Sequence, residues 1–228
     1  MLKHASTSWL LVLAGLSLST VAHAGRPMTT DDASITPAGE CQMQSWLQHA
    51  SAEDELWMLP ACSPFSRLEI TAGGAEHWNG SSNGTLWSAQ AKFLLRDEAP
   101  GEWGAAISIG WNRRHSAAPE DRVDAQPFNV VTSYRASDEA FAVHLNLGMR
   151  HDDAQDSTRT TWGAAYERAP AARLGEFVEV FGATGTSPTL QTGIRYDIVS
   201  DRISINGTVG AVMRDGLREP FVTVGLNL

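Results

Sequence analysis

An alternation with a period of two residues runs along nearly the whole chain. It is clearest over residues 190–198, where Leu190, Ile194, Tyr196 and Ile198 are separated by Gln191, Gly193, Arg195 and Asp197. Because successive strand residues point to opposite faces, every such strand has one apolar and one polar wall. Charged side chains gather on one wall, and the middle of the other has none. A charge on the lipid face at mid-depth costs roughly 2–4 kcal/mol, so a bilayer would enforce this pattern.

The alternation therefore predicts an all-β fold, an antiparallel transmembrane β-barrel of about 12 strands. A soluble periplasmic barrel or sandwich is the alternative, and in it the apolar wall would face inward. No segment after the first 24 residues has the ~20 consecutive apolar residues of a membrane helix. If the chain crosses a membrane, it must do so as a closed barrel, since lipid satisfies no backbone hydrogen bonds.

The first 24 residues have the three parts of a secretory signal peptide. Lys3 supplies the positive charge, residues 9–18 form a short apolar core, and Ala22-His23-Ala24 is a small-x-small cleavage motif. Cleavage after Ala24 would leave a mature chain that begins at Gly25; a retained signal anchor is the alternative. Export to the outer membrane of a Gram-negative cell is the expected localisation.

The rest of the chain divides into a short extension and one barrel domain. Residues 25–39 are rich in Thr, Asp and Pro and lack periodicity, which predicts an N-terminal extension or plug. Residues 40–228 form the expected outer-membrane β-barrel. Its strands are expected at 40–50, 54–62, 66–78, 85–96, 102–112, 127–135, 140–150, 159–168, 174–183, 189–199, 202–213 and 220–228. An even number places both termini at one end, with tight turns there and long loops at 112–126 and 151–158 opposite.

The two walls give two lists of residues. Aromatic residues of the apolar wall form two bands, which predict girdles at the two membrane interfaces: Phe93, Trp103, Tyr134, Phe141, Tyr166 and Tyr196 at the periplasmic ends, and Trp78, Trp87, Trp111, Phe128 and Trp162 at the outer ends. The polar wall predicts a lumen lined by Lys92, Arg96, Arg135, His144, Arg150, Glu167, Arg195 and Asp197.

Cysteine and charge content bound the cofactors and partners. Cys41 and Cys62 would face each other across the first hairpin, which predicts a disulfide in an exported chain. No further ligand stands near them at a recognised metal-site spacing, so we expect no metal and no cofactor. The chain has 17 Lys and Arg against 26 Asp and Glu, a net charge of −9, and this balance argues against nucleic acid as a partner.

Two residue groups raise other functions. Ser133, His144 and Glu167 point inward on consecutive strands, as a lipid hydrolase would require, but the expected hairpin register puts His144 opposite Val131. We therefore expect no catalytic residues and no enzyme. Arg113, Arg114 and His115 open the expected long loop, where the arginines could pair with lipopolysaccharide phosphates; a solvated loop is the alternative.

Two segments resemble known bacterial families. Arg26-Pro27-Met28-Thr29-Thr30-Asp31-Asp32-Ala33, followed by Pro37-Ala38-Gly39, resembles the start of outer-membrane proteins associated with the phenol meta-degradation pathway, described as transporters. The last eight residues, 221–228, resemble the terminal strand that the outer-membrane insertion machinery reads, although the chain ends in Leu228 where Phe is usual.

The resemblance implies a passive pore or transporter for small solutes, hydrophobic or aromatic compounds among them. A non-conducting structural barrel, or one that binds lipopolysaccharide or another ligand, is the alternative. The expected partners are membrane lipid, lipopolysaccharide, the insertion machinery and a small-molecule solute.

Overall fold

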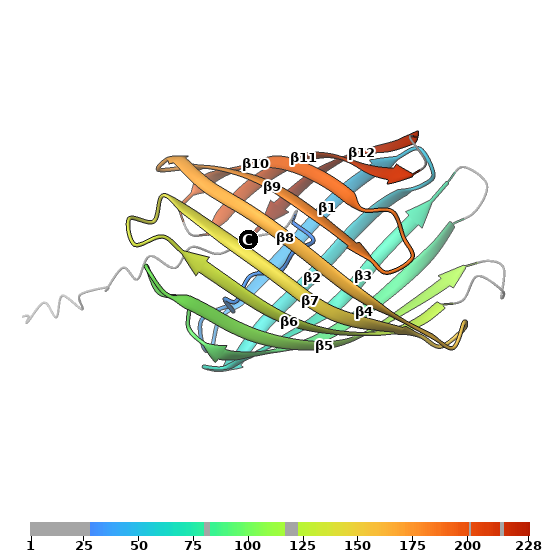
Figure 1. The fold of residues 1–228 in the computed structure, drawn as a ribbon, viewed down its shortest axis with the longest axis horizontal. Coiled ribbons are helices and arrows are strands. Elements are labelled where there is room, and N and C mark those ends of the chain that lie inside the picture. Colours follow the sequence, from blue (N-terminus) through green and yellow to red (C-terminus); the bar gives the residue numbers. More distant parts are fainter. Residues whose placement is uncertain (1–27, 80–82, 117–122, 201, 215–216) are drawn as a thin grey trace, which may run out of the picture.

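The chain folds into a closed barrel of twelve antiparallel strands (Figure 1). The computed structural model describes residues 28–79, 83–116, 123–200, 202–214 and 217–228. The predicted signal peptide, residues 1–24, lies outside them, as do residues 25–27. The strands are β1 (Cys41–Ala50), β2 (Asp54–Phe65), β3 (Leu68–Trp78), β4 (Asn83–Arg96), β5 (Trp103–Ser116), β6 (Val123–Arg135), β7 (Phe141–Asp152), β8 (Ser157–Ala171), β9 (Leu174–Ala183), β10 (Thr189–Val199), β11 (Ile203–Arg214) and β12 (Leu217–Asn227).

Each strand pairs with its neighbours in sequence, and β1 pairs with β12 to close the ring. Closure leaves no strand edge, which a lipid environment requires. We call the end where β1 begins and β12 ends the terminal end, and the opposite end the distal end. Within the part of the chain that the structure describes, no helix is long and apolar enough to cross a membrane.

The predicted strand number is confirmed, but the predicted bounds of two loops are wrong. Residues 112–116 and 123–126, and residues 151–152 and 157–158, continue the strands, with Arg114 opposite Val123 and Asp152 opposite Ser157. Charge had suggested loops there. At the distal end, however, strands can carry charge beyond the apolar zone because cross-strand ion pairs such as Arg113–Asp124, 2.5 Å apart, stabilise the ladder.

The outer face of the barrel is apolar. Residues predicted for the lipid-facing wall are largely exposed, including Ile109, Leu147 and Val209 at 58%, 61% and 56%. At the terminal end, four aromatic rings from β5 to β8 follow one another at centroid distances of 5.3, 6.3 and 5.8 Å: Trp103, Tyr134, Phe141 and Tyr166. Trp87, Phe128 and Trp162 are exposed toward the distal end. This arrangement of an apolar band between aromatic girdles is that of an outer-membrane barrel.

The N-terminal segment, residues 28–40, enters the barrel instead of extending away from it. Figure 1 shows this segment, coloured blue, inside the ring of strands. Its residues Met28, Thr30, Asp32, Ala33 and Thr36 are all buried at 5% exposure or less. The buried core of the molecule is therefore the contact between this segment and the inner wall of the barrel. We call residues 28–36 the plug.

Candidate functional site: a plugged lumen and its distal cavity

One lysine on the wall holds two consecutive acids of the plug. The Nζ atom of Lys92, on β4, lies 3.0 Å from Asp31 Oδ1 and 3.6 Å from Asp32 Oδ1. Successive side chains of β4 point alternately to the lumen and to the outside, and Lys92 points to the lumen. Only 4% of Lys92 is exposed. A buried ammonium needs carboxylate partners to offset its desolvation, so the plug supplies the charge that this wall position lacks.

Two wall carboxylates hold the plug backbone from opposite sides. On β9, Glu179 accepts hydrogen bonds from the amides of Thr29 and Thr30 at 2.8 and 2.7 Å, and another from the side chain of Gln191. On β3, Glu69 accepts from both the amide and the hydroxyl of Thr36, at 2.8 and 2.6 Å. Hydrogen bonds to a charged acceptor are roughly twice as strong as neutral ones. The plug is therefore tied to strands that lie far apart around the ring.

The middle of the plug pairs with polar side chains of β6 and β7. Asn146 accepts from the amide of Asp31 at 2.9 Å and donates to its carbonyl at 2.7 Å, so one side chain imitates a strand neighbour. The amide of Ala33 donates to Ser133 Oγ at 2.8 Å. These bonds satisfy backbone groups that would otherwise be buried without partners.

Ser133 and His144 are direct neighbours, and the predicted register of this hairpin is wrong. Ser133 faces His144 across β6 and β7, and its Oγ lies 2.7 Å from His144 Nδ1. The turn differs by two residues in register because its apex moves toward the C-terminus. Glu139 takes a positive φ of 57°, and Asp138 accepts a hydrogen bond from the amide of Ala140.

The contact does not make an accessible catalytic site. Ser133 and His144 are both fully buried beneath the plug. Ser133 Oγ accepts the Ala33 amide as well as contacting His144 Nδ1, and His144 Nε2 has no hydrogen-bond partner among the described residues. Glu167 lies opposite Ala142 and faces Arg195 at 4.0 Å. The three residues therefore do not form a triad, and the serine and histidine serve to seat the plug.

Apolar contacts complete the seat. Met28 packs with Ala165 and Phe177, and Ala33 packs with Ala106 and Val131. Gly163 permits a close approach to the plug, since a Cβ built there would lie 2.7 Å from Thr30 Oγ1. The small residues on the wall match the path of the plug.

At the terminal end of the lumen, two arginines lie close to carboxylates of opposite charge. Arg135 lies 2.8 Å from Glu98, and Arg195 lies between Glu167 and Asp197 at 4.0 and 3.8 Å. Glu98 belongs to the turn between β4 and β5, where burial raises the pKa of its carboxyl although Arg135 opposes the shift.

Arg96 does not take the lumen position that alternation assigns to it. A register shift between Leu94 and Arg96 pairs Arg96 with Ala105, which belongs to the outward wall. The Arg96 side chain is 59% exposed and lies 2.7 Å from Glu102. Strict alternation fails here because one bulged residue reverses the faces of those that follow it.

Distal to the plug, the lumen opens into a cavity of about 770 Å³. Asp31 and Asp32 of the plug form part of its floor, and Trp57, Phe181 and amide side chains form part of its wall. Arg150 also lines it, near the distal mouth. A side recess of about 190 Å³ adjoins it, and there Trp46 and Trp57 stack at 5.2 Å. In the described part of the chain, no group of three or more His, Cys, Asp or Glu residues could hold a metal ion.

The arginines expected in a distal loop lie instead on β5, and each has a carboxylate partner on another element. Arg113, on the outer face, pairs with Asp124 and lies 4.8 Å from the Trp111 ring. Arg114 faces the lumen and contacts Glu53 at 3.0 Å and Glu55 at 3.4 Å. They therefore lie on a strand and not in a loop, and they do not form one basic cluster; pairing with lipopolysaccharide phosphates stays a prediction.

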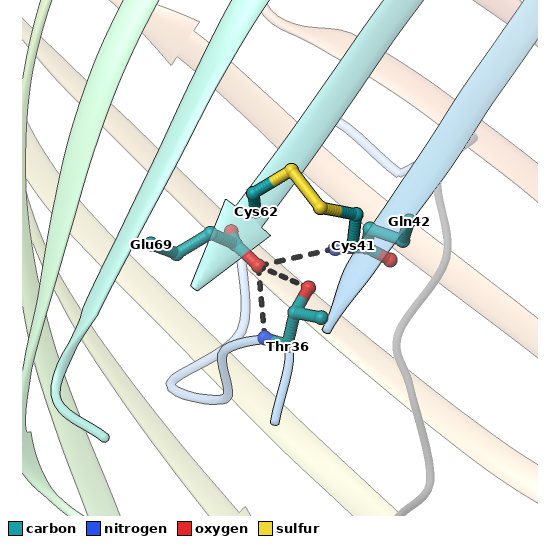
Figure 2. Close-up of a disulfide and its surroundings, with 5 residues drawn as sticks. All are labelled: Thr36, Cys41, Gln42, Cys62 and Glu69. Carbon is teal, nitrogen blue, oxygen red and sulfur yellow. Dashed lines mark hydrogen bonds between the residues drawn. A yellow bond between two sulfur atoms is a disulfide. The ribbon is translucent and has the colours of Figure 1, made fainter. Parts of the chain in front are cut away.

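The disulfide predicted between Cys41 and Cys62 is present at the terminal ends of β1 and β2 (Figure 2). The two residues are direct cross-strand partners, with Cα atoms 4.1 Å apart. Figure 2 also shows Glu69 beside the bridge, holding Thr36 and the side chain of Gln42, which lies 3.2 Å away. The disulfide thus stands where the plug leaves the lumen and the barrel begins.

Glu69 and Glu179 hold the plug, and the sequence pattern did not single them out. Alternation does assign both to the polar wall, and Glu179 stands between Val178 and Val180 in mid-strand. An isolated acid in mid-strand needs a hydrogen-bonding or cationic partner, so its presence in the sequence was the one signal that something else enters the lumen there. The partner is a backbone segment about 150 residues away in the sequence, which no local pattern reveals.

Comparisons with known proteins agree with this architecture. The KdgM porin in complex with disordered oligogalacturonate superposes with a TM-score of 0.61 at 13% identity, over 82% of this chain and 97% of that one. The COG4313 outer membrane channel from Pseudomonas putida F1 gives 0.58 at 10% identity, over 86% and 97%. Outer membrane phospholipase A from Escherichia coli gives 0.53 at 10% identity, over 91% and 94%.

At these identities the likeness shows the fold, a porin-like barrel of the outer membrane. No curated protein matched the sequence. The family model described as "Uncharacterised conserved protein UCP029691" matches residues 12–228. This match spans nearly the whole chain, the plug included, and the chain therefore belongs to that family of uncharacterised conserved proteins.

Proposed function

We propose that this barrel is a passive outer-membrane pore or transporter for small solutes, and that its plug controls the passage. The observation that carries the proposal is a distal cavity of about 770 Å³ whose floor is the plug, inside a closed barrel. A twelve-stranded barrel is wider than the eight-stranded barrels that side chains alone can fill. The terminal end would face the periplasm, because β1 begins and β12 ends there.

The solute class in the proposal comes from two sources. The N-terminal motif that resembles transporters associated with phenol meta-degradation forms the plug from Met28 onward, and it implies hydrophobic or aromatic solutes. Trp57 and Phe181 in the cavity wall support that class, since they offer apolar ring surface. A catalytic role is not part of the proposal, because Ser133 and His144 are buried.

Single-channel recording in planar bilayers tests the proposal, with Lys92→Met as the key variant. Removing the Lys92 charge leaves Asp31 and Asp32 unpaired, which should weaken the seat of the plug by about 3–5 kcal/mol. We expect Lys92→Met to conduct more, or more often, than the natural protein. Arg168→Gln, which removes an exposed cation on β8 paired with Glu176, is the matched control and should leave conductance unchanged. If neither the natural protein nor Lys92→Met conducts at any voltage although both are folded, the pore proposal is wrong.

A second candidate is a non-conducting barrel that binds a ligand or lipopolysaccharide. The plug itself favours it, because polar and ionic contacts tie it to five strands, β3, β4, β6, β7 and β9. Under this alternative, Lys92→Met would stay silent, while a ligand would still bind from the distal side. Membrane lipid would contact the apolar wall in either case, and the terminal strand would engage the insertion machinery.

A further inference from the structure

Two arginines stand directly opposite each other on the wall of the distal cavity. Arg150 of β7 pairs in register with Arg159 of β8, and both line the cavity. Like charges in direct cross-strand positions destabilise a sheet, so structure alone does not favour this pair. Elsewhere on the lumen wall, cations face acids, as Lys92 faces Glu69 across β3 and β4.

The pair also lacks a carboxylate partner in the described residues. The lumen arginines Arg114, Arg135 and Arg195 each have an acid within 4 Å. Arg159 instead donates from Nη2 to the neutral amide oxygen of Gln155, Oε1, at 3.4 Å. Both arginines are exposed to the cavity and not to lipid. Their guanidinium donors therefore remain available to an anion from outside.

The rest of the cavity restricts what that anion can be. Phe181, on β9, lies opposite Gly163 of β8. Gly163 is on the same strand as Arg159 and faces the same side of the sheet. Trp57 lines the cavity and the side recess, with its indole Nε1 already donated to Glu55 at 2.7 Å. The aromatic wall thus offers ring faces more than further hydrogen-bond donors. The site combines paired cations with apolar ring surface in one cavity.

We propose that the distal cavity binds small ring-bearing carboxylates, with the carboxylate on Arg150 and Arg159 and the ring against Trp57 and Phe181. Guanidinium groups match a carboxylate in charge and in planar geometry. The proposal deepens the pore hypothesis and rests on it for its biological meaning, since the cavity would then be the entry of the transport path. Binding itself requires no conduction.

Titration calorimetry of benzoate binding to the folded protein in detergent tests the site separately from conductance. We expect the Arg150→Gln/Arg159→Gln variant to bind benzoate at least about tenfold more weakly than the natural protein. Arg168→Gln is the matched control, because it removes an exposed arginine from the outer wall of β8. Retained heat-modifiable migration in gels would show that each variant is folded.

Three further probes separate the parts of the proposal. Benzyl alcohol, which has the ring without the charge, should bind weakly and equally to all three proteins. Acetate, which has the charge without the ring, should bind more weakly than benzoate. Inorganic phosphate tests whether any anion, including a lipid phosphate, occupies the arginines. Equal benzoate affinity in natural and double-variant proteins, no benzoate binding, or phosphate binding tighter than benzoate would each overturn the proposal.

Discussion

At the scale of single residues, Glu179 shows how a wall position can decide the state of the lumen. Its two carboxylate oxygens accept consecutive plug amides, and only 1% of the residue is exposed. A buried carboxylate is stable only when its hydrogen-bonding capacity is filled. The plug amides also need acceptors, so the wall and the plug each satisfy the other.

Replacing Glu179 with Gln should therefore loosen the plug while the barrel stays closed. The substitution removes the charge and one acceptor, which we expect to cost about 1.5–3 kcal/mol of docking free energy. Hydrogen exchange of peptides covering residues 28–36 would measure this loss. We expect the protection of these amides to fall by roughly 10-fold or more. Glu176→Gln is the matched control, since Glu176 is on the same strand but on the surface, bonded to Arg168. Equal protection in the two variants would contradict this role for Glu179.

At the scale of elements, the first hairpin connects three features: β1 closes the ring against β12, the plug enters before it, and Cys41–Cys62 bridges its terminal end. A bridge with a sequence separation of 21 restricts the unfolded chain, which corresponds to about 3 kcal/mol in the loop-entropy treatment. The Cys41→Ser/Cys62→Ser variant should still form the barrel but unfold at lower urea concentration. Reductant should lower the midpoint of the natural protein and leave the variant unchanged; an equal midpoint in both proteins would show that the bridge adds no stability.

Alternation is sufficient to predict the elements because the bilayer acts on each strand separately. The outward residues of β7, such as Leu145 and Leu147, must be apolar wherever their hydrogen-bond partners lie. Strand ends and registers depend instead on local geometry. The bulge at Arg96 and the positive φ of Glu139 each changed one prediction, and neither residue type announces such a conformation.

The candidate site was less accessible to prediction than the strands. Lys92, His144 and Arg150 were assigned to the polar wall, but what each contacts depends on a segment without periodicity. Whether residues 28–36 lie inside or outside the ring is set by contacts with β3, β4, β6, β7 and β9 together. Such long-range contacts appear only in the folded molecule.

At the scale of the whole molecule, the barrel and its plug are stabilised by different interactions. Ladder hydrogen bonds and the apolar outer wall hold the barrel in the membrane independently of the lumen. The plug is held mostly by ion pairs and hydrogen bonds, which can be exchanged for contacts with water at modest cost, and by two small apolar contacts at Met28 and Ala33. We therefore expect the plug to leave its seat at a much lower free energy than the barrel unfolds.

A reversible covalent lock of the plug tests this account most directly. A Cβ built on Gly163 would lie 3.5 Å from Thr30 Cβ, which is within the range for a disulfide. The measurement is bilayer conductance of Thr30→Cys/Gly163→Cys in the Lys92→Met background, before and after reduction. The natural protein and Lys92→Met, each with and without reductant, control for reduction of Cys41–Cys62. The account predicts a silent channel when the lock is oxidised and the full Lys92→Met conductance after reduction; equal conductance in both states would contradict it.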